Sequence, residues 1–149
     1  MTATLFTIGY EGADPDRLAA ALRGAGVATL ADVRAVASSR KRGFSKSALA
    51  AHLAENDLGY VHLRGLGTPA SGRAAARAKD VATMRRIFCD GVLDTAEGEA
   101  ALADLAARAG GEDGPLCLFC FERDPAGCHR RVLAERLAAR GFAVVDLFA

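Results

Sequence analysis

A short segment near the carboxyl end of the chain holds most of the side chains with reactive chemistry. An apolar run at residues 116–121 ends in polar residues, and a thiol, an imidazole and two guanidinium groups follow a break that contains Pro125 and Gly127. Thiols and imidazoles support nucleophilic chemistry, and arginine pairs well with phosphate or carboxylate. The candidates in this segment are Cys120, Glu122, Cys128, His129 and Arg130.

A strand, a tight loop and a helix are predicted to position these groups. The run at 116–121 is too short for a typical helix and contains aromatic residues, so it is predicted to be a buried strand. Apolar residues then recur at helical spacing at Val132, Leu133 and Leu137. A helix start presents free backbone N–H groups and a partial positive charge, which would favour a thiolate at Cys128. The alternative interpretation of Cys128 is a small residue that fills a tight turn.

Alternating strand and helix patterns predict an α/β fold for the whole chain. The expected strands are 4–9, 27–33, 59–63, 116–121 and 142–148. The expected helices follow Asp14-Pro15 and Ser45, cover 77–93, begin at Thr95 and cover 128–140. Strands separated by helices favour a three-layer sandwich with a mostly parallel, Rossmann-like sheet. The Gly-rich stretch 64–73 has no periodicity and is predicted to be a long loop.

The carboxyl ends of parallel strands lie at one edge of a sheet, where open α/β folds bind their ligands. The other strand ends bring further polar side chains to this edge, namely Tyr10, Asp32, Arg34, His62 and Arg64. Loops are polar in general, but an aspartate inside the apolar run 30–33 requires a buried partner. We therefore expect a functional rim at the strand ends.

The rim residues are assigned to two roles. The predicted catalytic residues are Asp32, Cys120, Glu122 and Cys128. The predicted binding residues are Tyr10, Arg34, His62, Arg64, His129 and Arg130. A structural alternative is that Arg34 and Arg130 pair with Asp32 and Glu122 to hold the buried rim together. Structural ion pairs perturb pKa values as catalytic groups do, so the sequence leaves both interpretations open.

Several of these residues form a pattern that resembles the domain of unknown function 488 family. The pattern comprises Ile8-Gly9-Tyr10, Asp32-Val33-Arg34, Phe44 after a basic loop and, most specifically, Cys120-Phe121-Glu122 followed by Cys128-His129-Arg130. It extends from near the N-terminus to the last helix. The resemblance implies an α/β fold and a set of positions, and it implies no reaction.

Cys117 and Cys120 have the C-x-x-C spacing of some zinc and redox sites, but strand geometry argues against a shared site. Residues three apart on a strand face opposite sides, so Cys117 is expected to be an inert core thiol. No cofactor is predicted. Zinc is kept as an alternative, with ligands from Cys120, Cys128, His129, Glu122 and Asp32. Consecutive helical residues point about 100° apart, which makes shared ligation by Cys128 and His129 awkward.

The arginines at the rim favour one function over two others. We expect a phosphate-bearing or other anionic ligand, such as a nucleotide or nucleic acid, to bind there. The first alternative is a thiol enzyme that uses Cys120 or Cys128 and loosely resembles rhodanese-type sulfurtransferases. Ala126 and Ala134 stand where those enzymes have the arginine of their cysteine loop, which argues against it. The second alternative is a non-catalytic module that binds a partner.

The totals of the chain describe an ordinary globular protein. Its 149 residues fit one domain, 1–149, and 51% of them are apolar. The formal net charge of +1 argues against a strongly basic nucleic-acid arm but allows a local basic patch.

Neither a signal peptide nor a membrane span is predicted, so the protein is expected in the cytoplasm. Its four cysteines are then expected to be reduced unless they are catalytic or bind metal. The sequence predicts neither the substrate nor the oligomeric state.

Overall fold

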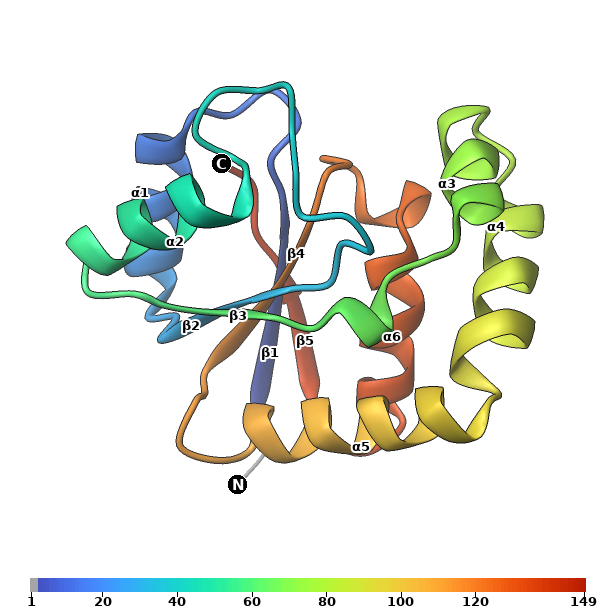
Figure 1. The fold of residues 1–149 in the computed structure, drawn as a ribbon. Coiled ribbons are helices and arrows are strands. Elements are labelled where there is room, and N and C mark those ends of the chain that lie inside the picture. Colours follow the sequence, from blue (N-terminus) through green and yellow to red (C-terminus); the bar gives the residue numbers. More distant parts are fainter. Residues whose placement is uncertain (1–2) are drawn as a thin grey trace.

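A five-stranded parallel sheet forms the centre of the fold within residues 3–149 (Figure 1). The computed structural model describes these residues. The strands of the sheet are β1 (Thr4–Gly9), β2 (Thr29–Asp32), β3 (Gly59–His62), β4 (Leu116–Cys120) and β5 (Ala143–Asp146). Across the sheet they lie in the order β3-β2-β4-β1-β5, and every neighbouring pair is parallel. Met1 and Thr2, which begin the segment for which no signal peptide is predicted, lie outside the described residues.

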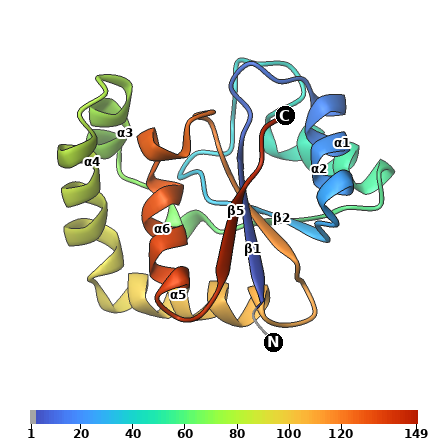
Figure 2. The ribbon, with the colours of Figure 1, turned by 180° about the vertical axis from the view of Figure 1, so that it is seen from behind.

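Helices cover both faces of this sheet (Figures 1 and 2). Helices α1 (Pro15–Ala25) and α2 (Lys46–Glu55) pack on one face, and α5 (Ala96–Ala109) and α6 (His129–Ala138) pack on the other. Helices α3 (Ala70–Arg77) and α4 (Val81–Phe88) lie beyond α6, farther from the sheet. This arrangement confirms the predicted three-layer α/β sandwich. Within residues 3–149, no helix is both long enough and apolar enough to cross a membrane.

Strand β4 is buried along its whole length and faces two different cores. Leu116, Leu118 and Cys120 pack with the core on the side of α5 and α6, whereas Cys117 and Phe119 pack on the side of α1 and α2. This alternation is that of a strand whose successive side chains point to opposite faces. The predicted separation of Cys117 from Cys120 is confirmed. Cys117 is a fully buried core residue, and this burial raises the pKa of its thiol.

The neighbouring strands β1 and β4 create a crevice at their carboxyl ends. After β1 the chain crosses to α1 on one face of the sheet, and after β4 it crosses to α6 on the other. Connections that leave adjacent strands toward opposite faces form the crevice in which such folds bind ligands. Gly9 ends β1 so close to the backbone carbonyl of Glu122 that a Cβ atom would collide with it. Glycine at this position therefore allows the two loops to approach each other.

Local sequence signals explain where several helices begin. Asp14 accepts a hydrogen bond from a first-turn N–H of α1 at 2.8 Å, and Pro15 occupies the first helical position, as predicted. Thr95 caps α5 in the same way, with its hydroxyl 3.0 Å from a first-turn nitrogen. Ser45 precedes α2, but its hydroxyl contacts the Ser39 backbone instead of the helix.

The prediction of a long loop at residues 64–73 is wrong. A short 3₁₀ turn at Arg64–Leu66 leads to α3, which begins at Ala70. Pro69 and Gly72 hide the helical signal in the sequence. Proline is nevertheless compatible with a helix start, and Gly72 is needed because a larger residue would collide with the Thr68 side chain.

The helix predicted over 77–93 is also interrupted. α3 ends at Arg77, and α4 begins only at Val81, with the Asp80 side chain accepting a hydrogen bond from a first-turn N–H at 3.2 Å. Lys79 has a φ of 60°, a left-handed conformation that ends a helix. A π-turn at Cys89–Leu93 then follows α4. The break places α3 and α4 as two separate helices beside the crevice.

Candidate functional site

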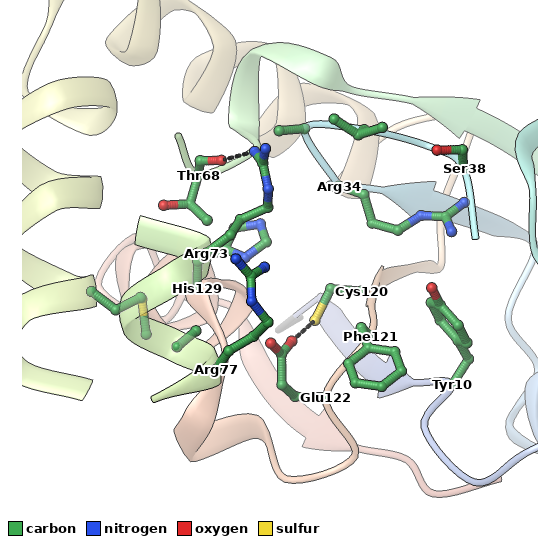
Figure 3. Close-up of a pocket in the computed structure, with 14 residues that line it drawn as sticks. Tyr10, Arg34, Ser38, Thr68, Arg73, Arg77, Cys120, Phe121, Glu122 and His129 are labelled. Carbon is green, nitrogen blue, oxygen red and sulfur yellow. Dashed lines mark hydrogen bonds between the residues drawn. The ribbon is translucent and has the colours of Figure 1, made fainter. Parts of the chain in front are cut away.

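A cavity of about 210 Å³ opens at the carboxyl ends of β1 and β4 (Figure 3). Side chains reach it from the loops after β1, β2 and β4, from α3 and from the start of α6. Five residues predicted from the sequence share it, namely Tyr10, Arg34, Cys120, Glu122 and His129. The predicted meeting of distant strand ends therefore has a concrete location in the structure.

Arg34 is held at the wall of the cavity by the buried carboxylate of Asp32. Its Nε and Nη2 donate to Asp32 Oδ1 and Oδ2 at 2.9 and 2.7 Å, and its Nη1 donates to the Phe44 carbonyl oxygen at 2.8 Å. The Tyr60 hydroxyl donates to the same carboxylate at 2.5 Å. Burial opposes the charge on Arg34, but the hydrogen bonds and charge of Asp32 outweigh it and raise the pKa of Arg34. The guanidinium is therefore largely engaged within the protein.

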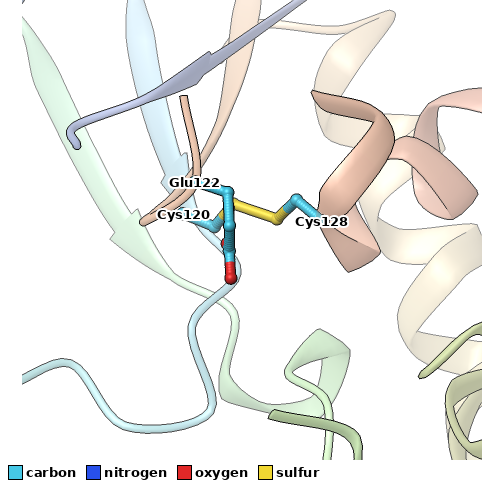
Figure 4. A group of neighbouring side chains, drawn as sticks. All are labelled: Cys120, Glu122 and Cys128. Carbon is cyan, nitrogen blue, oxygen red and sulfur yellow. A yellow bond between two sulfur atoms is a disulfide. The ribbon is translucent and has the colours of Figure 1, made fainter. Parts of the chain in front are cut away.

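Two sulfur atoms meet beside the cavity (Figure 4). Cys120, at the end of β4, and Cys128, immediately before α6, are joined by a disulfide. Both cysteines are buried, and of the two only Cys120 lines the cavity. Glu122 Oε2 lies 3.5 Å from Cys120 Sγ. The disulfide departs from the expectation that the cysteines are reduced.

A second arginine, Arg130, is completely buried beside these sulfur atoms. Its Nη1 donates to Cys120 Sγ at 3.0 Å and to the Glu122 carbonyl oxygen at 2.6 Å, and its Nη2 donates to the Arg123 carbonyl oxygen at 3.4 Å. Its Nε has no hydrogen-bond partner among the described residues. Burial lowers the pKa of Arg130. Its contacts are a sulfur atom and backbone oxygens, so it does not pair with the Glu122 carboxylate as the structural alternative supposed.

His129 is neutral and has a defined tautomer. Its Nε2 lies 2.8 Å from the Val33 carbonyl oxygen, which can only accept a hydrogen bond, so Nε2 carries the proton. The other ring nitrogen, Nδ1, is then a free acceptor 3.7 Å from Cys128 Sγ. Burial lowers the pKa of His129 to about 4. The ring is therefore an oriented hydrogen-bond acceptor beside Cys128 and a weak base.

The acidic member of the site, Glu122, is also perturbed by burial. Desolvation raises the pKa of Glu122, and the positive charge of Arg130 opposes this shift. A carboxyl group that retains its proton more readily is suited to exchange that proton with a neighbouring thiol. Glu122 therefore brings a carboxyl group of raised pKa to the cavity, beside Cys120.

Three donor groups are close enough together to hold a metal ion. One ligand atom each from Cys120, Glu122 and Cys128 lies within 4.8 Å of the others. Ligation would require both sulfurs to leave the disulfide, and the positive charge of Arg130 beside Cys120 opposes a second cation. Cys128 precedes α6 in an extended conformation, so the divergence expected for consecutive helical residues does not apply to it and His129.

His62 and Arg64 lie at the same edge of the sheet but outside the cavity. His62 Nε2 lies 2.8 Å from the Arg34 carbonyl oxygen. Both residues line a more open hollow beside it, together with Lys46. Their predicted binding role therefore concerns a neighbouring surface, and it stays a prediction.

Two arginines that the sequence does not single out complete the cavity. Arg73 and Arg77 lie four residues apart on α3, so their side chains leave the same face of the helix and point into the cavity (Figure 3). Arg73 Nη1 donates to the Thr68 carbonyl oxygen at 2.9 Å. Within residues 3–149, neither arginine forms an ion pair with a carboxylate. Their spacing would have revealed them if α3 had been recognised as a helix.

A comparison with protein families agrees with the pattern in the sequence. Residues 14–137 match the family model described as Domain of unknown function DUF488. The chain belongs to this family. Comparison with the curated proteins and with the solved structures found no match.

The DUF488 match includes two walls of the cavity. Asp32-Val33-Arg34 supplies one, and the segment from Cys120 to Arg130 supplies the other. Ile8-Gly9-Tyr10 lies before the matched residues, although Gly9 contacts the second wall. In this DUF488 chain the arrangement combines unpaired arginines, suited to hold an anion, with a pair of cysteines, suited to thiol chemistry.

Proposed function

We propose that the cavity binds the anionic group of a small ligand, such as the phosphate of a nucleotide, between Arg73 and Arg77. One observation carries the proposal. Both guanidinium groups point into the cavity, and neither pairs with a carboxylate among the described residues. Arginine presents a planar set of N–H donors that matches phosphate and carboxylate oxygens, so two of them on one helix face make an anion site.

The other charged groups of the cavity compensate this positive charge only in part. Asp32 is paired with Arg34, so the two charges cancel. The lowered pKa of His129 makes its ring neutral, and among the residues that line the cavity Glu122 is the carboxyl group that faces Arg73 and Arg77. A cavity with excess positive charge raises the local concentration of anions.

Apolar surface beside the cavity can accommodate the remainder of the ligand. Phe121 is 45% exposed and Val36 is 54% exposed, and both line the cavity. A second hollow of about 670 Å³ shares Arg77, Phe121 and Glu122 with the cavity and adds Lys79 together with the acidic Glu11 and Asp124. Exposed aromatic rings stack on nucleobases, which supports a nucleotide or the end of a nucleic acid as the ligand.

Calorimetric titration at low salt tests the proposal, with inorganic pyrophosphate and adenosine monophosphate as probes. We expect Arg73→Ala and Arg77→Ala each to weaken binding by about tenfold or more, because each removes a charge-assisted hydrogen bond. Binding should also weaken as salt is added, since the attraction is electrostatic.

Arg140→Ala is the matched control, because Arg140 is exposed and follows α6 at the opposite edge of the sheet. It should leave the affinity unchanged. Affinities for both probes that are the same in Arg73→Ala, Arg77→Ala and the unaltered protein would refute the proposal, as would no binding at all.

The thiol enzyme is the second candidate function. It is favoured by the two sulfur atoms that meet beside the same cavity, one of them on its wall. The anion site and the thiol pair are compatible, because one can hold the substrate on which the other acts.

A further inference from the structure

We propose that Cys120 and Cys128 carry out thiol–disulfide exchange at the cavity and that their substrate is a small anionic disulfide. The choice of an anionic substrate rests on the anion site proposed above, whereas the exchange itself rests on the contacts of the two cysteines. Cys120 is the attacking residue and Cys128 the resolving residue.

Cys120 has the contacts of an attacking thiol. It lines the cavity, so a substrate can reach it, and Arg130 Nη1 donates to its sulfur at 3.0 Å. A guanidinium at this distance stabilises a thiolate relative to a thiol. The buried Arg130 forms no ion pair with a carboxylate among the described residues, and its Nε is unpartnered. A thiolate at Cys120 would place a negative charge in direct contact with it.

Cys128 has the contacts of a resolving thiol. It does not line the cavity, so a substrate cannot approach it first, yet its sulfur adjoins that of Cys120. His129 Nδ1 lies 3.7 Å from Cys128 Sγ as a free acceptor, and the hydrogen bond to the Val33 carbonyl oxygen fixes the ring. An oriented ring nitrogen beside the thiol can receive its proton as the sulfur attacks.

The first step joins the substrate to Cys120. The Cys120 proton moves to Glu122 Oε2, and the thiolate attacks one sulfur of the substrate disulfide. A bond forms between Cys120 Sγ and that sulfur, and the substrate S–S bond breaks. The leaving substrate thiolate takes the proton from Glu122, so Glu122 returns to its starting state.

The second step releases the substrate and leaves the state seen in the structure. The Cys128 sulfur attacks Cys120 Sγ while its proton passes to His129 Nδ1, and the bond between Cys120 and the substrate breaks in the same step. The departing second substrate sulfur takes the proton from His129, so the ring does not stay charged. Two electrons have passed from the protein to the substrate, which leaves as two thiols. A dithiol reductant restores Cys120 and Cys128 by the same exchange in reverse.

The other two cysteines provide the contrast within the same chain. Cys117 is fully buried in the core on the opposite side of β4, with a raised pKa, and Cys89 lies on the π-turn after α4. Neither lines the cavity. Cys89 is only partly buried and could react with a reagent, so the test is made in a Cys89→Ser background.

The probe is dithiobis(nitrobenzoate), a chromogenic disulfide that carries two carboxylates. The reduced full-length protein should release two equivalents of the coloured thiol quickly and retain no adduct, because Cys128 resolves the mixed disulfide. Cys128→Ser should release one equivalent and retain a nitrobenzoate adduct on Cys120 by mass spectrometry. Cys120→Ser should lose the fast reaction. Rapid, equal labelling of Cys128 in Cys120→Ser would overturn the assignment of roles.

A neutral probe, dithiodipyridine, separates this inference from the proposed function. Arg73→Ala and Arg77→Ala should slow the reaction with the anionic probe by about tenfold relative to the neutral probe, because only the former needs the anion site. If both probes respond alike while Cys120 and Cys128 still pair, the exchange stands and the anion site fails. If pyrophosphate binds but the cysteines do not pair, the exchange fails and the anion site stands.

Metal analysis of the reduced protein tests the alternative that Cys120, Cys128 and Glu122 bind zinc. Elemental analysis should find no stoichiometric zinc after purification under reducing conditions. Bound zinc, with release of the coloured thiol only after a chelator is added, would overturn the exchange and assign Cys120, Cys128 and Glu122 as ligands.

Discussion

Arg34 and Arg130 are both buried, Arg34 at the wall of the cavity and Arg130 behind Cys120, and they differ in what they contact. Arg34 makes two hydrogen bonds to the carboxylate of Asp32 and one to a backbone oxygen. Arg130 contacts the Cys120 sulfur and backbone oxygens, and its Nε has no partner among the described residues. Asp32 raises the pKa of Arg34 in spite of burial, whereas burial lowers the pKa of Arg130.

The difference in contacts indicates which of the two arginines stabilises the fold. Removing one partner from a buried, fully hydrogen-bonded ion pair is destabilising, because the remaining charge stays buried. A buried cation without a counter-charge instead disfavours the resting state and favours any state in which a negative charge forms beside it. Arg34 thus fits a structural role, and Arg130 fits a role at a reactive sulfur.

The largest effect should come from the paired arginine. We expect Asp32→Ala to lower the free energy of unfolding by about 3–5 kcal/mol, because it leaves the charge of Arg34 buried and unpaired. Urea-induced unfolding measures this loss. The double variant Asp32→Leu with Arg34→Met removes both charges and should be less destabilised than the single variant. A loss below about 1 kcal/mol in Asp32→Ala, with pyrophosphate binding abolished, would instead give Asp32 a role in ligand binding.

His129 links the two arginines, because its ring bonds to Val33, between Asp32 and Arg34, and contacts Cys128 beside Arg130. Its pKa is about 4 in the native state and about 6.5 in an unfolded chain. The unfolded state therefore takes up the proton first as the pH falls. Stability should decrease by at most about 3 kcal/mol between roughly pH 6.5 and roughly pH 4.

Glu122 changes the stability with pH in the opposite direction to His129. Its raised pKa makes the native state the one that takes up a proton first, so it offsets part of the loss at low pH. Urea unfolding over a pH series in His129→Gln should show a shallower decline than in the unaltered protein, with His52→Gln on α2 as the control. An unchanged decline in His129→Gln would show that other groups determine acid sensitivity.

The smallest loss of stability should come from the unpaired arginine. We expect Arg130→Met to lower the free energy of unfolding by about 1–3 kcal/mol, because it removes hydrogen bonds but leaves no buried carboxylate alone. It should also slow alkylation of Cys120 by iodoacetamide in the reduced protein, and Arg130→Lys should restore part of the rate. If Arg130→Met were as destabilising as Asp32→Ala and left the alkylation rate unchanged, the contrast between the two arginines would disappear.

The sequence was informative wherever a local pattern determined the structure. The apolar run before Cys120, the Asp14-Pro15 helix start and the alternation of strands and helices predicted the sheet and its two helical layers. Arg73 and Arg77 were missed because Pro69 and Gly72 made the start of α3 look like a loop. Pro69 is compatible with the helix because it stands directly before its first residue. Gly72 is needed because a larger residue would collide with the Thr68 side chain, and only the packing shows this.

The sequence by itself determined the family, the strand order along the chain and the gathering of polar residues at the strand ends, because these follow from local periodicity and residue types. The partners of those residues were decided by the tertiary structure. The sequence places both Arg34 and Arg130 at the rim and does not distinguish their roles. Arg34 meets the carboxylate of Asp32, two residues earlier, whereas Arg130 meets a sulfur because β4 lies between β1 and β2 and its end carries Cys120 toward α6. Contacts between segments far apart in the chain depend on that position of β4, and no local pattern contains it.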